Sequence, residues 1–398
     1  MKFEDFQKQT AFSFDDLIAY SQGTLIDGAP AGLPALPGSL LLPFHEITRL
    51  SWDAASGAGR IEAVRRNRVD EWFYACHFLG DPVMPGCWGI DAVWQALKFF
   101  AAWRGIARCD KALAMDNVSF FGQIRPYDQK IVYAVDVLSI EESDGETLVT
   151  GKAAVSVDGM PVYTIASAQV ATTFWETDPA ARPSAALPAP DRSVSRHLSC
   201  DEFSARDRLS HAEVLALSQG TLIEPSSSEI GLLPCSLMLE IGRIERISFD
   251  EATGEGRIIA TRPNSALEWF YAMNRGGKPT ALTIDAVWQL LGLFLTWRQN
   301  AGTGRALGFE KVEVFDDIRP TDQEIVCEEH ILKMTRAEGA AGAFARADAK
   351  VFADGRLVLA CTNASVGCHK NIRYSDYPQL TDMATGGKLK TARKSEYA

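Results

Sequence analysis

The sequence predicts an α+β protein built from two similar halves, each an antiparallel sheet around one long buried helix. Three observations support this class. The chain repeats itself, each copy contains one long apolar segment with helical spacing, and segments that alternate as strands do follow each helix. A chain of 398 residues also has the length of two ordinary domains, each able to bury a core.

The repeat is visible letter by letter. Ser21–Ile26 recurs unchanged at Ser218–Ile223, an offset of 197 residues, and the two Trp-Phe-Tyr-Ala motifs share this offset. Asp91 and its counterpart Asp285 are 194 residues apart. Three residues are therefore missing from the second copy, between its Trp-Phe-Tyr-Ala motif and its aspartate.

The long apolar segment of the first half predicts a buried helix. Over residues 90–101, apolar side chains recur at three and four residues and cover nearly every face, which is typical of a helix inside a core. Pro85 and Gly86 mark a tight turn into this helix. Asp91 is its one acid, and Gln95 lies one turn later on the same face, placed to orient the carboxylate.

The other elements of the first half are shorter. Residues 1–20 predict a helix that Ser13 caps, and residues 47–63 predict two strands around a turn. Alternation predicts three further strands, at Ile131–Val137, Gly151–Val157 and Pro161–Val170. Asp158-Gly159 predicts a tight hairpin between the last two, and Asp354-Gly355 repeats it in the second half.

These features divide the chain into four parts. We expect a first domain at residues 1–175, a linker at 176–200, a second domain at 201–370 and a polar tail at 371–398. The linker is rich in proline and alanine and has no apolar periodicity, so it is expected to let the two domains lie side by side.

Composition indicates a soluble globular protein. Hydrophobic residues make up 46% of the chain, and the N-terminus carries acids where a secretory signal would be apolar. No apolar run is expected to span a bilayer, so no membrane partner is predicted. The net charge of −11 argues against nucleic acid as a partner. The eight cysteines are scattered, which predicts reduced thiols and a cytoplasmic location.

The start of the first long helix combines residues suited to acid–base chemistry. His77 is a candidate base, and Asp91 is a candidate acid because burial raises the pKa of a carboxyl group. The backbone N–H groups of Gly86 and Cys87 open the helix and suit a developing negative charge. This set fits proton abstraction beside a thioester carbonyl followed by loss of a β-hydroxyl, one of several chemistries it allows. In a purely structural interpretation, His77 is a core histidine and Asp91 bonds an internal group.

This segment closely resembles the active-site motif of the bacterial 3-hydroxydecanoyl-acyl-carrier-protein dehydratases, the FabA-like family, whose members have the hotdog fold. The ungapped likeness spans His77, Gly80–Cys87 and Asp91-Ala92. Leu36-Pro37-Gly38 and Gly304–Gly308 also resemble this family, and the likeness covers roughly residues 20–175 and 215–370. The tandem arrangement is similar to the paired dehydratase regions of polyunsaturated fatty acid and polyketide synthases.

The resemblance implies a double hotdog with one complete active site. In the second copy Asn274 replaces His77 and cannot act as a base, yet Asp285 and Gln289 are kept. In dimeric family members each site takes its histidine from one subunit and its aspartate from the other. The resemblance therefore implies that the halves form a pseudo-dimer in which His77 works with Asp285, oriented by Gln289. Asp91 would then face a dead pocket containing Asn274; the rival assignment pairs His77 with Asp91.

The implied reaction is dehydration of a 3-hydroxyacyl thioester, carried by an acyl carrier protein, to a trans-2-enoyl thioester. Isomerisation to the cis-3 position stays open, as does a further homodimer. No metal site is predicted, and no cofactor is implied beyond the phosphopantetheine of the carrier. The alternatives are a hotdog thioesterase and a non-catalytic module of a synthase complex. An acidic carrier would need a basic patch, for which the candidates are Arg65, Arg66, Arg68, Arg104 and Arg108.

Overall fold

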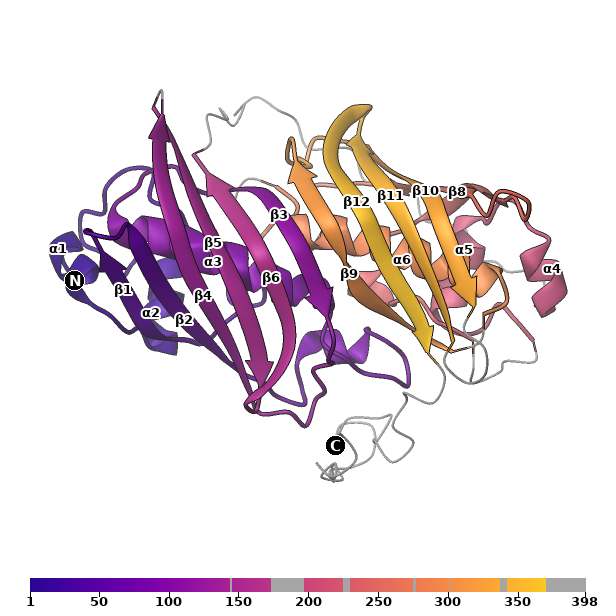
Figure 1. Ribbon diagram of the computed structural model, residues 1–398, viewed down its shortest axis with the longest axis horizontal. Helices are drawn as coiled ribbons and strands as arrows, with labels where there is room; N and C mark the ends of the chain where they lie inside the picture. Colours follow the sequence, from indigo (N-terminus) through magenta and orange to yellow (C-terminus); the bar gives the residue numbers. More distant parts are fainter. Residues whose placement is uncertain are drawn as a thin grey trace.

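The computed structural model of the chain describes residues 1–143, 145–172, 197–224, 230–274, 277–300, 302–336 and 342–369. Most of the predicted linker and all of the predicted tail therefore lie outside the described residues. The two halves lie side by side, with the first half on the left in Figure 1.

The first half has two short helices and a hairpin before its long helix, and four strands after it. Its elements are α1 (Phe3–Lys8), α2 (Phe14–Ser21), β1 (Glu46–Asp53), β2 (Ala58–Arg66), a 3₁₀ turn (Trp72–Ala75), α3 (Gly86–Arg104), β3 (Lys111–Phe120), β4 (Lys130–Ser143), β5 (Glu146–Val157) and β6 (Met160–Ala171). Ser13 caps α2 as predicted, because its hydroxyl accepts a hydrogen bond from the backbone N–H of Asp16. The single helix predicted over residues 1–20 is wrong, since two helices form there.

The second half repeats this order. Its elements are α4 (Cys200–Ser204), α5 (His211–Ser218), a 3₁₀ turn (Ser236–Met238), β7 (Arg243–Phe249), β8 (Gly256–Pro263), α6 (Thr280–Trp297), β9 (Thr303–Val314), β10 (Glu324–Arg336), β11 (Ala343–Ala353) and β12 (Arg356–His369). Both predicted hairpins are confirmed. Asp158 and Gly159 have φ of 49° and 86°, and Asp354 and Gly355 have φ of 46° and 80°, as a tight two-residue turn requires.

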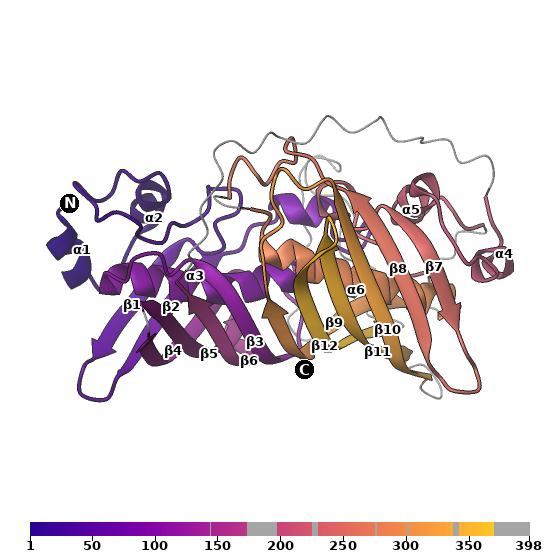
Figure 2. The same cartoon turned by 90° about the horizontal axis from the view of Figure 1, so that it is seen from above.

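The described strands form one antiparallel sheet in the order β1-β2-β4-β5-β6-β3-β9-β12-β11-β10-β8-β7. Strands β3 and β9 join the halves, with Met115 opposite Val312. Helices α3 and α6 lie on the same face of this sheet and contact each other (Figure 2). Each half thus contributes six strands that wrap around its own long helix, and the two sets are continuous through β3 and β9, which is a double hotdog; the predicted fold class is confirmed.

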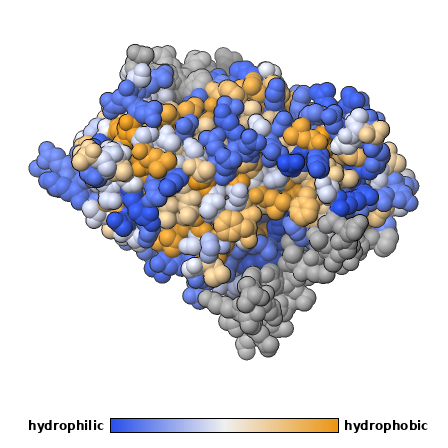
Figure 3. All heavy atoms as spheres, viewed as in Figure 1, coloured by the Kyte–Doolittle hydropathy of each residue, from blue (hydrophilic) through white to orange (hydrophobic). Residues whose placement is uncertain are grey.

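The opposite face of the sheet points to solvent. Strand β4 alternates between buried and more exposed residues along most of its length, as expected when one face packs on a core and the other is solvated. Figure 3 views this outer face and shows polar side chains interspersed with apolar ones. The site must therefore be sought on the helix side of the sheet.

Helix α6 is apolar along most of its length. By length and composition alone Thr280–Trp297 could cross a membrane, with a mean hydropathy of 1.3, although no apolar run of that length was expected. However, 89% of the helix is buried inside the fold, where an all-round apolar surface is what a core helix needs.

Candidate active site

His77 follows the 3₁₀ turn Trp72–Ala75 and is 8% exposed. Its Nδ1 lies 2.9 Å from the carbonyl oxygen of Val83. A carbonyl only accepts, so Nδ1 carries the proton and Nε2 keeps its lone pair. Burial lowers the pKa of His77 to about 4, and the positive charge of Arg305 adds to this effect. The imidazole is therefore neutral at pH 7, with Nε2 able to accept a proton.

Asp285 lies in the second turn of α6 and is 4% exposed. Burial raises the pKa of this carboxyl group to about 7, against the opposing effect of hydrogen bonds from Gln289 and from the thiol of Cys87. The Nε2 of Gln289 is 2.6 Å from Oδ2 of Asp285. At neutral pH a large fraction of Asp285 is protonated, which is the state that a general acid needs.

Gln289 is itself held by the backbone of the second half. Its Nε2 also donates to the carbonyl of Met238 at 2.7 Å, and its Oε1 accepts from the backbone N–H of Glu240 at 2.9 Å. With both ends of the amide bonded, the side chain has one orientation. The carboxyl group of Asp285 is thereby fixed as well.

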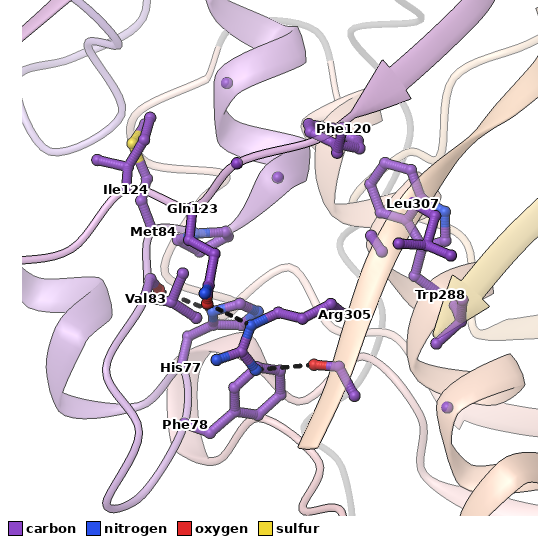
Figure 4. Close-up of a pocket in the computed structure, with 18 of the residues that line it drawn as sticks. His77, Phe78, Val83, Met84, Phe120, Gln123, Ile124, Trp288, Arg305 and Leu307 are labelled. Atoms are coloured by element: carbon purple, nitrogen blue, oxygen red, sulfur yellow. Dashed lines mark hydrogen bonds between the residues drawn. The ribbon is translucent and has the colours of Figure 1, made fainter. Parts of the chain in front are cut away.

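His77 and Asp285 come from different halves and border the same cavity of about 1080 Å³. Figure 4 shows His77, Met84 and Trp288 around this space, with side chains from both halves. The rim on the first half includes Phe121 and Met160, which are 58% and 65% exposed. The structure thus brings the predicted histidine to the same cavity as the aspartate of the other half.

Asp91 does not border this cavity. It is buried on α3, and the Nε2 of Gln95 lies 3.3 and 3.4 Å from its two carboxylate oxygens. Burial raises the pKa of Asp91 to about 6, with the charge of Lys98 and the bond from Gln95 opposing the rise. Asp91 therefore has a raised pKa, as Asp285 does, but it does not border the cavity at His77.

The dead pocket that sequence reasoning expected beside Asp91 has almost closed. A space of about 10 Å³ remains at the corresponding place, and neither Asp91 nor Asn274 borders it. The side-chain amide of Asn274 instead donates to the carbonyl of Gly277 at 2.8 Å. Asp91 and Asn274 therefore do not share this space.

Gly86 and Cys87 open α3 after the N-cap residue Pro85. The first N–H groups of a helix have no acceptor within the helix and can bind an oxyanion. Gly86 borders the cavity, whereas Cys87 does not and is fully buried behind it. The thiol of Cys87 bonds to Asp285, and burial raises its own pKa well above the usual value. Cys87 thus contacts the acid directly, which the sequence did not suggest.

A buried ion network joins the two halves beside His77. The carboxylate of Asp81 accepts from Arg125 at 2.9 Å and from Arg305, on β9 of the second half, at 2.6 Å. Gln123 accepts from both arginines, at 2.9 and 2.8 Å. Burial alone would raise the pKa of Asp81, but the two guanidinium groups hold it below its usual value. Arg305 lies in the Gly304–Gly308 motif. This motif resembles the FabA-like family, but the sequence assigned no role to Arg305.

Tyr163 on β6 was missed by sequence reasoning. It borders the cavity, is 3% exposed, and its hydroxyl has no hydrogen-bond partner among the described residues. A Cβ at Gly89 would lie 2.3 Å from this hydroxyl, so only glycine leaves room for it against α3. The repeat could have drawn attention to Tyr163, because the matching residue of the second copy is Leu359, which has no hydroxyl.

The arginines expected to dock a carrier differ in exposure. Arg65 is buried and donates to the carbonyl of Leu42 at 2.9 Å and to the carboxylate of Glu71 at 2.7 Å. It therefore cannot face a partner, and its place in the predicted patch is a correction. Arg66 and Arg68 are exposed. Among the described residues, no group of three or more His, Cys, Asp or Glu side chains is arranged to hold a metal ion.

Comparison with known proteins gives a family match over most of the two repeats. The sequence profile of the FabA-like domain matches residues 36–166 and 233–362. Among solved structures, the chain is similar to the dehydratase domain from the CurJ module of curacin polyketide synthase, with 14% identity over 84% of this chain and 98% of that chain and a TM-score of 0.44. It is also similar to the dehydratase domain of a mycocerosic acid synthase-like polyketide synthase, with 13% identity over 78% and 92% and a TM-score of 0.45.

Proposed function

The chain belongs to the FabA-like domain family, and from that premise we propose that it is a dehydratase that converts 3-hydroxyacyl thioesters into trans-2-enoyl thioesters. The observation that carries this proposal is the pairing at the cavity. A neutral histidine and a protonated aspartic acid, one from each half, border the same buried space.

In the proposed reaction, the Nε2 of His77 removes the proton from C2 of the substrate. The electron pair of that C–H bond forms the C2–C3 double bond as the bond from C3 to the hydroxyl oxygen breaks. Asp285 gives its proton to the departing oxygen, which leaves as water. His77 ends protonated and Asp285 ionised, and transfer of one proton between them through solvent restores both groups.

The negative charge that develops on the thioester carbonyl needs hydrogen-bond donors. Gly86 borders the cavity at the start of α3, where backbone N–H groups and the helix dipole both favour an oxyanion. The hydroxyl of Tyr163 is a further donor at the same wall. We assign Gly86, with Cys87 beside it, to the carbonyl, and Tyr163 to a hydrogen bond with the bound substrate.

The thioester is proposed to arrive on the phosphopantetheine arm of an acyl carrier protein, in fatty acid, polyunsaturated fatty acid or polyketide synthesis. The exposed rim of the cavity at Phe121 and Met160 is where such an arm would enter. No further cofactor is needed, because the chemistry is proton transfer between side chains and substrate.

The test is the rate of dehydration of a 3-hydroxyacyl thioester, followed as enoyl absorbance. We expect His77→Ala and Asp285→Asn each to lower kcat/KM by about 10³-fold, within the range for loss of a general acid or base. Asp91→Asn is the matched control, since it makes the same change at the corresponding place of α3, and it should retain activity.

Loss of activity in Asp91→Asn with Asp285→Asn spared would contradict the pairing across the halves. A parent protein that dehydrates no 3-hydroxyacyl thioester of any length would contradict the function itself. A parent that instead hydrolyses acyl thioesters would favour the thioesterase alternative.

A further inference from the structure

The cavity extends past His77 and Asp285 into the second half, along one face of α6. The α6 residues on its wall recur with helical spacing: Asp285, Trp288, Gln289, Gly292, Leu293, Leu295 and Thr296. At about 1.5 Å per residue, the stretch from Asp285 to Thr296 is about 16 Å long. We call the part of the cavity bordered by Leu217, Leu233, Gly292, Leu293, Leu295 and Thr296 the distal arm.

The distal arm is lined by buried aliphatic side chains. Leu217, Leu293 and Leu295 are each no more than 2% exposed. The hydroxyl of Thr296 already donates within the fold, to the carbonyls of Gly292 and Gly231 at 3.2 and 3.3 Å. These walls suit a hydrocarbon and offer a polar ligand little to bond.

Gly292 is the residue that opens the arm. A Cβ built there has no heavy atom within 4 Å, although the position is in the middle of a buried helix. Glycine is unfavourable within a helix, because it adds backbone freedom to the unfolded chain. The space beside Gly292 is explained if part of a bound substrate occupies it.

The matching end of the first half is filled with aromatic rings. Phe6, Phe12, Tyr20 and Phe99 pack together there, with ring centroids 5.0 to 5.7 Å apart. At the equivalent positions the second half has Phe203, Leu209, Leu217 and Leu293. Three of four rings have been replaced by smaller side chains, which widens the space beside α6.

Charged residues also separate the two ends. Lys98 on α3 occupies the position of Gly292 on α6, and Asp110 occupies the position of Gly304, which borders the open cavity. Lys98 interacts electrostatically with Asp91 and Asp110. A hydrocarbon chain could not displace these groups without a large desolvation cost. The open space beside the long helix is thus found in the second half, which contributes Asp285, and not at the matching end of the first half.

We propose that the distal arm binds the far end of a long, unbranched acyl chain and that Gly292 sets the longest chain accepted. This rests on the proposed dehydratase function and adds the class of substrate. With roughly 1.3 Å per carbon, from C–C bonds of about 1.5 Å, the stretch of about 16 Å from Asp285 to Thr296 holds about 12 carbons beyond the reacting centre. Each buried methylene is worth about a fourfold gain in kcat/KM.

The test compares 3-hydroxyacyl pantetheine thioesters of 4 to 16 carbons. In the parent protein kcat/KM should rise with length. In Gly292→Leu the ratio of kcat/KM for 14 carbons to that for 4 carbons should fall at least about tenfold, with Gly292→Ala between the two. Lys98→Leu is the matched control, at the same position of α3, and should keep the ratio of the parent.

Each outcome separates this inference from the function on which it rests. An unchanged ratio in Gly292→Leu, with dehydration intact, would overturn the distal arm and leave the dehydratase standing. If no chain is dehydrated, binding of tetradecanoyl pantetheine by calorimetry decides: weaker binding to Gly292→Leu than to the parent would support the arm, and equal binding would overturn it. Circular dichroism of each variant checks that it folds.

Discussion

The two halves of this chain contain the same order of elements, but the corresponding spaces beside their long helices differ greatly in volume. The cavity at His77 has a volume of about 1080 Å³, and the corresponding space in the other half has about 10 Å³. At the mouth, Gly122 and Met160 of the open site correspond to Asp316 and Arg356. Arg356 forms an ion pair with Asp316 and another, at 2.8 Å, with Asp322, so charged side chains bridge the closed mouth.

Charged side chains also replace apolar ones in the interior of the closed site. Lys278 occupies the place of Met84, and its ammonium group is buried against the carboxylate of Glu240. Yet the backbone N–H of Glu240 bonds to Gln289, which holds the acid of the open site. Residues of the closed half therefore help to position Asp285 through Gln289.

The largest expected effect tests whether the closed half can be turned back into an active site. We expect His77→Ala combined with Asn274→His to stay about 10³-fold below the parent in kcat/KM, as His77→Ala alone does. A histidine at position 274 gains no cavity, because the corresponding space has only about 10 Å³ and Lys278 borders it. Dehydration kinetics measure this.

The single variant Asn274→His serves as the control and should dehydrate at the parental rate. Recovery of more than about a tenth of the parental kcat/KM in the double variant would show that the closed half retains a usable site.

The second effect is on stability. Lys278→Met copies the open half at this position and removes the partner of a carboxylate that is itself fully buried. Loss of one member of a buried ion pair costs about 3–5 kcal/mol in the free energy of unfolding. Chemical denaturation measures it. Arg262, 3.9 Å from the same carboxylate, limits the loss.

Adding Glu240→Gln to Lys278→Met should recover part of this stability, since no buried charge is then left unpaired. If Lys278→Met alone were as stable as the parent, the ion pair would not hold the closed site together.

The third effect concerns Tyr163, which the closed half replaces by Leu359. We expect Tyr163→Phe to lower kcat/KM about tenfold, which corresponds to about 1.4 kcal/mol and one hydrogen bond to the substrate. Tyr133→Phe is the control, because the hydroxyl of Tyr133 is also buried without a partner among the described residues but does not border the cavity. Equal losses in both variants would make the effect structural.

The fold could be predicted from sequence because its signals are local or repeated. Helix α3, the two Asp-Gly hairpins and the offset between copies can each be read from a short stretch. Strands β3 and β9, which join the halves, were missed. The alternation of β3 is broken by a bulge between Ala112 and Ala114, and its partners are distant in sequence.

The candidate site was predictable as residue types but not as an arrangement. The motif indicated His77, and the resemblance to dimeric family members implied its pairing with the retained Asp285 of the other half. The contact from Cys87 to the acid and the unpartnered hydroxyl of Tyr163 depend on how α3, α6 and β6 pack. No spacing rule encodes such contacts, because they join segments far apart in the chain.

The smallest effect concerns the protonation of Asp285. The thiol of Cys87 donates to its carboxylate and so favours the ionised form, whereas Ala281 at the matching place beside Asp91 cannot. In the proposed reaction Asp285 acts in its protonated form, so kcat/KM should fall as the pH rises through about 7, while the pKa of His77, about 4, limits activity only in acid. Removing the thiol in Cys87→Ala raises the pKa of Asp285.

The alkaline limb of the pH profile should therefore move to higher pH by about half a unit to one unit, the size of one weak hydrogen bond. Ala281→Cys, which places a thiol beside Asp91, is the control and should leave both limbs in place. A shift of the alkaline limb to lower pH in Cys87→Ala would mean that the thiol favours the protonated acid, and an unmoved limb would mean that Asp285 is not the group that titrates there.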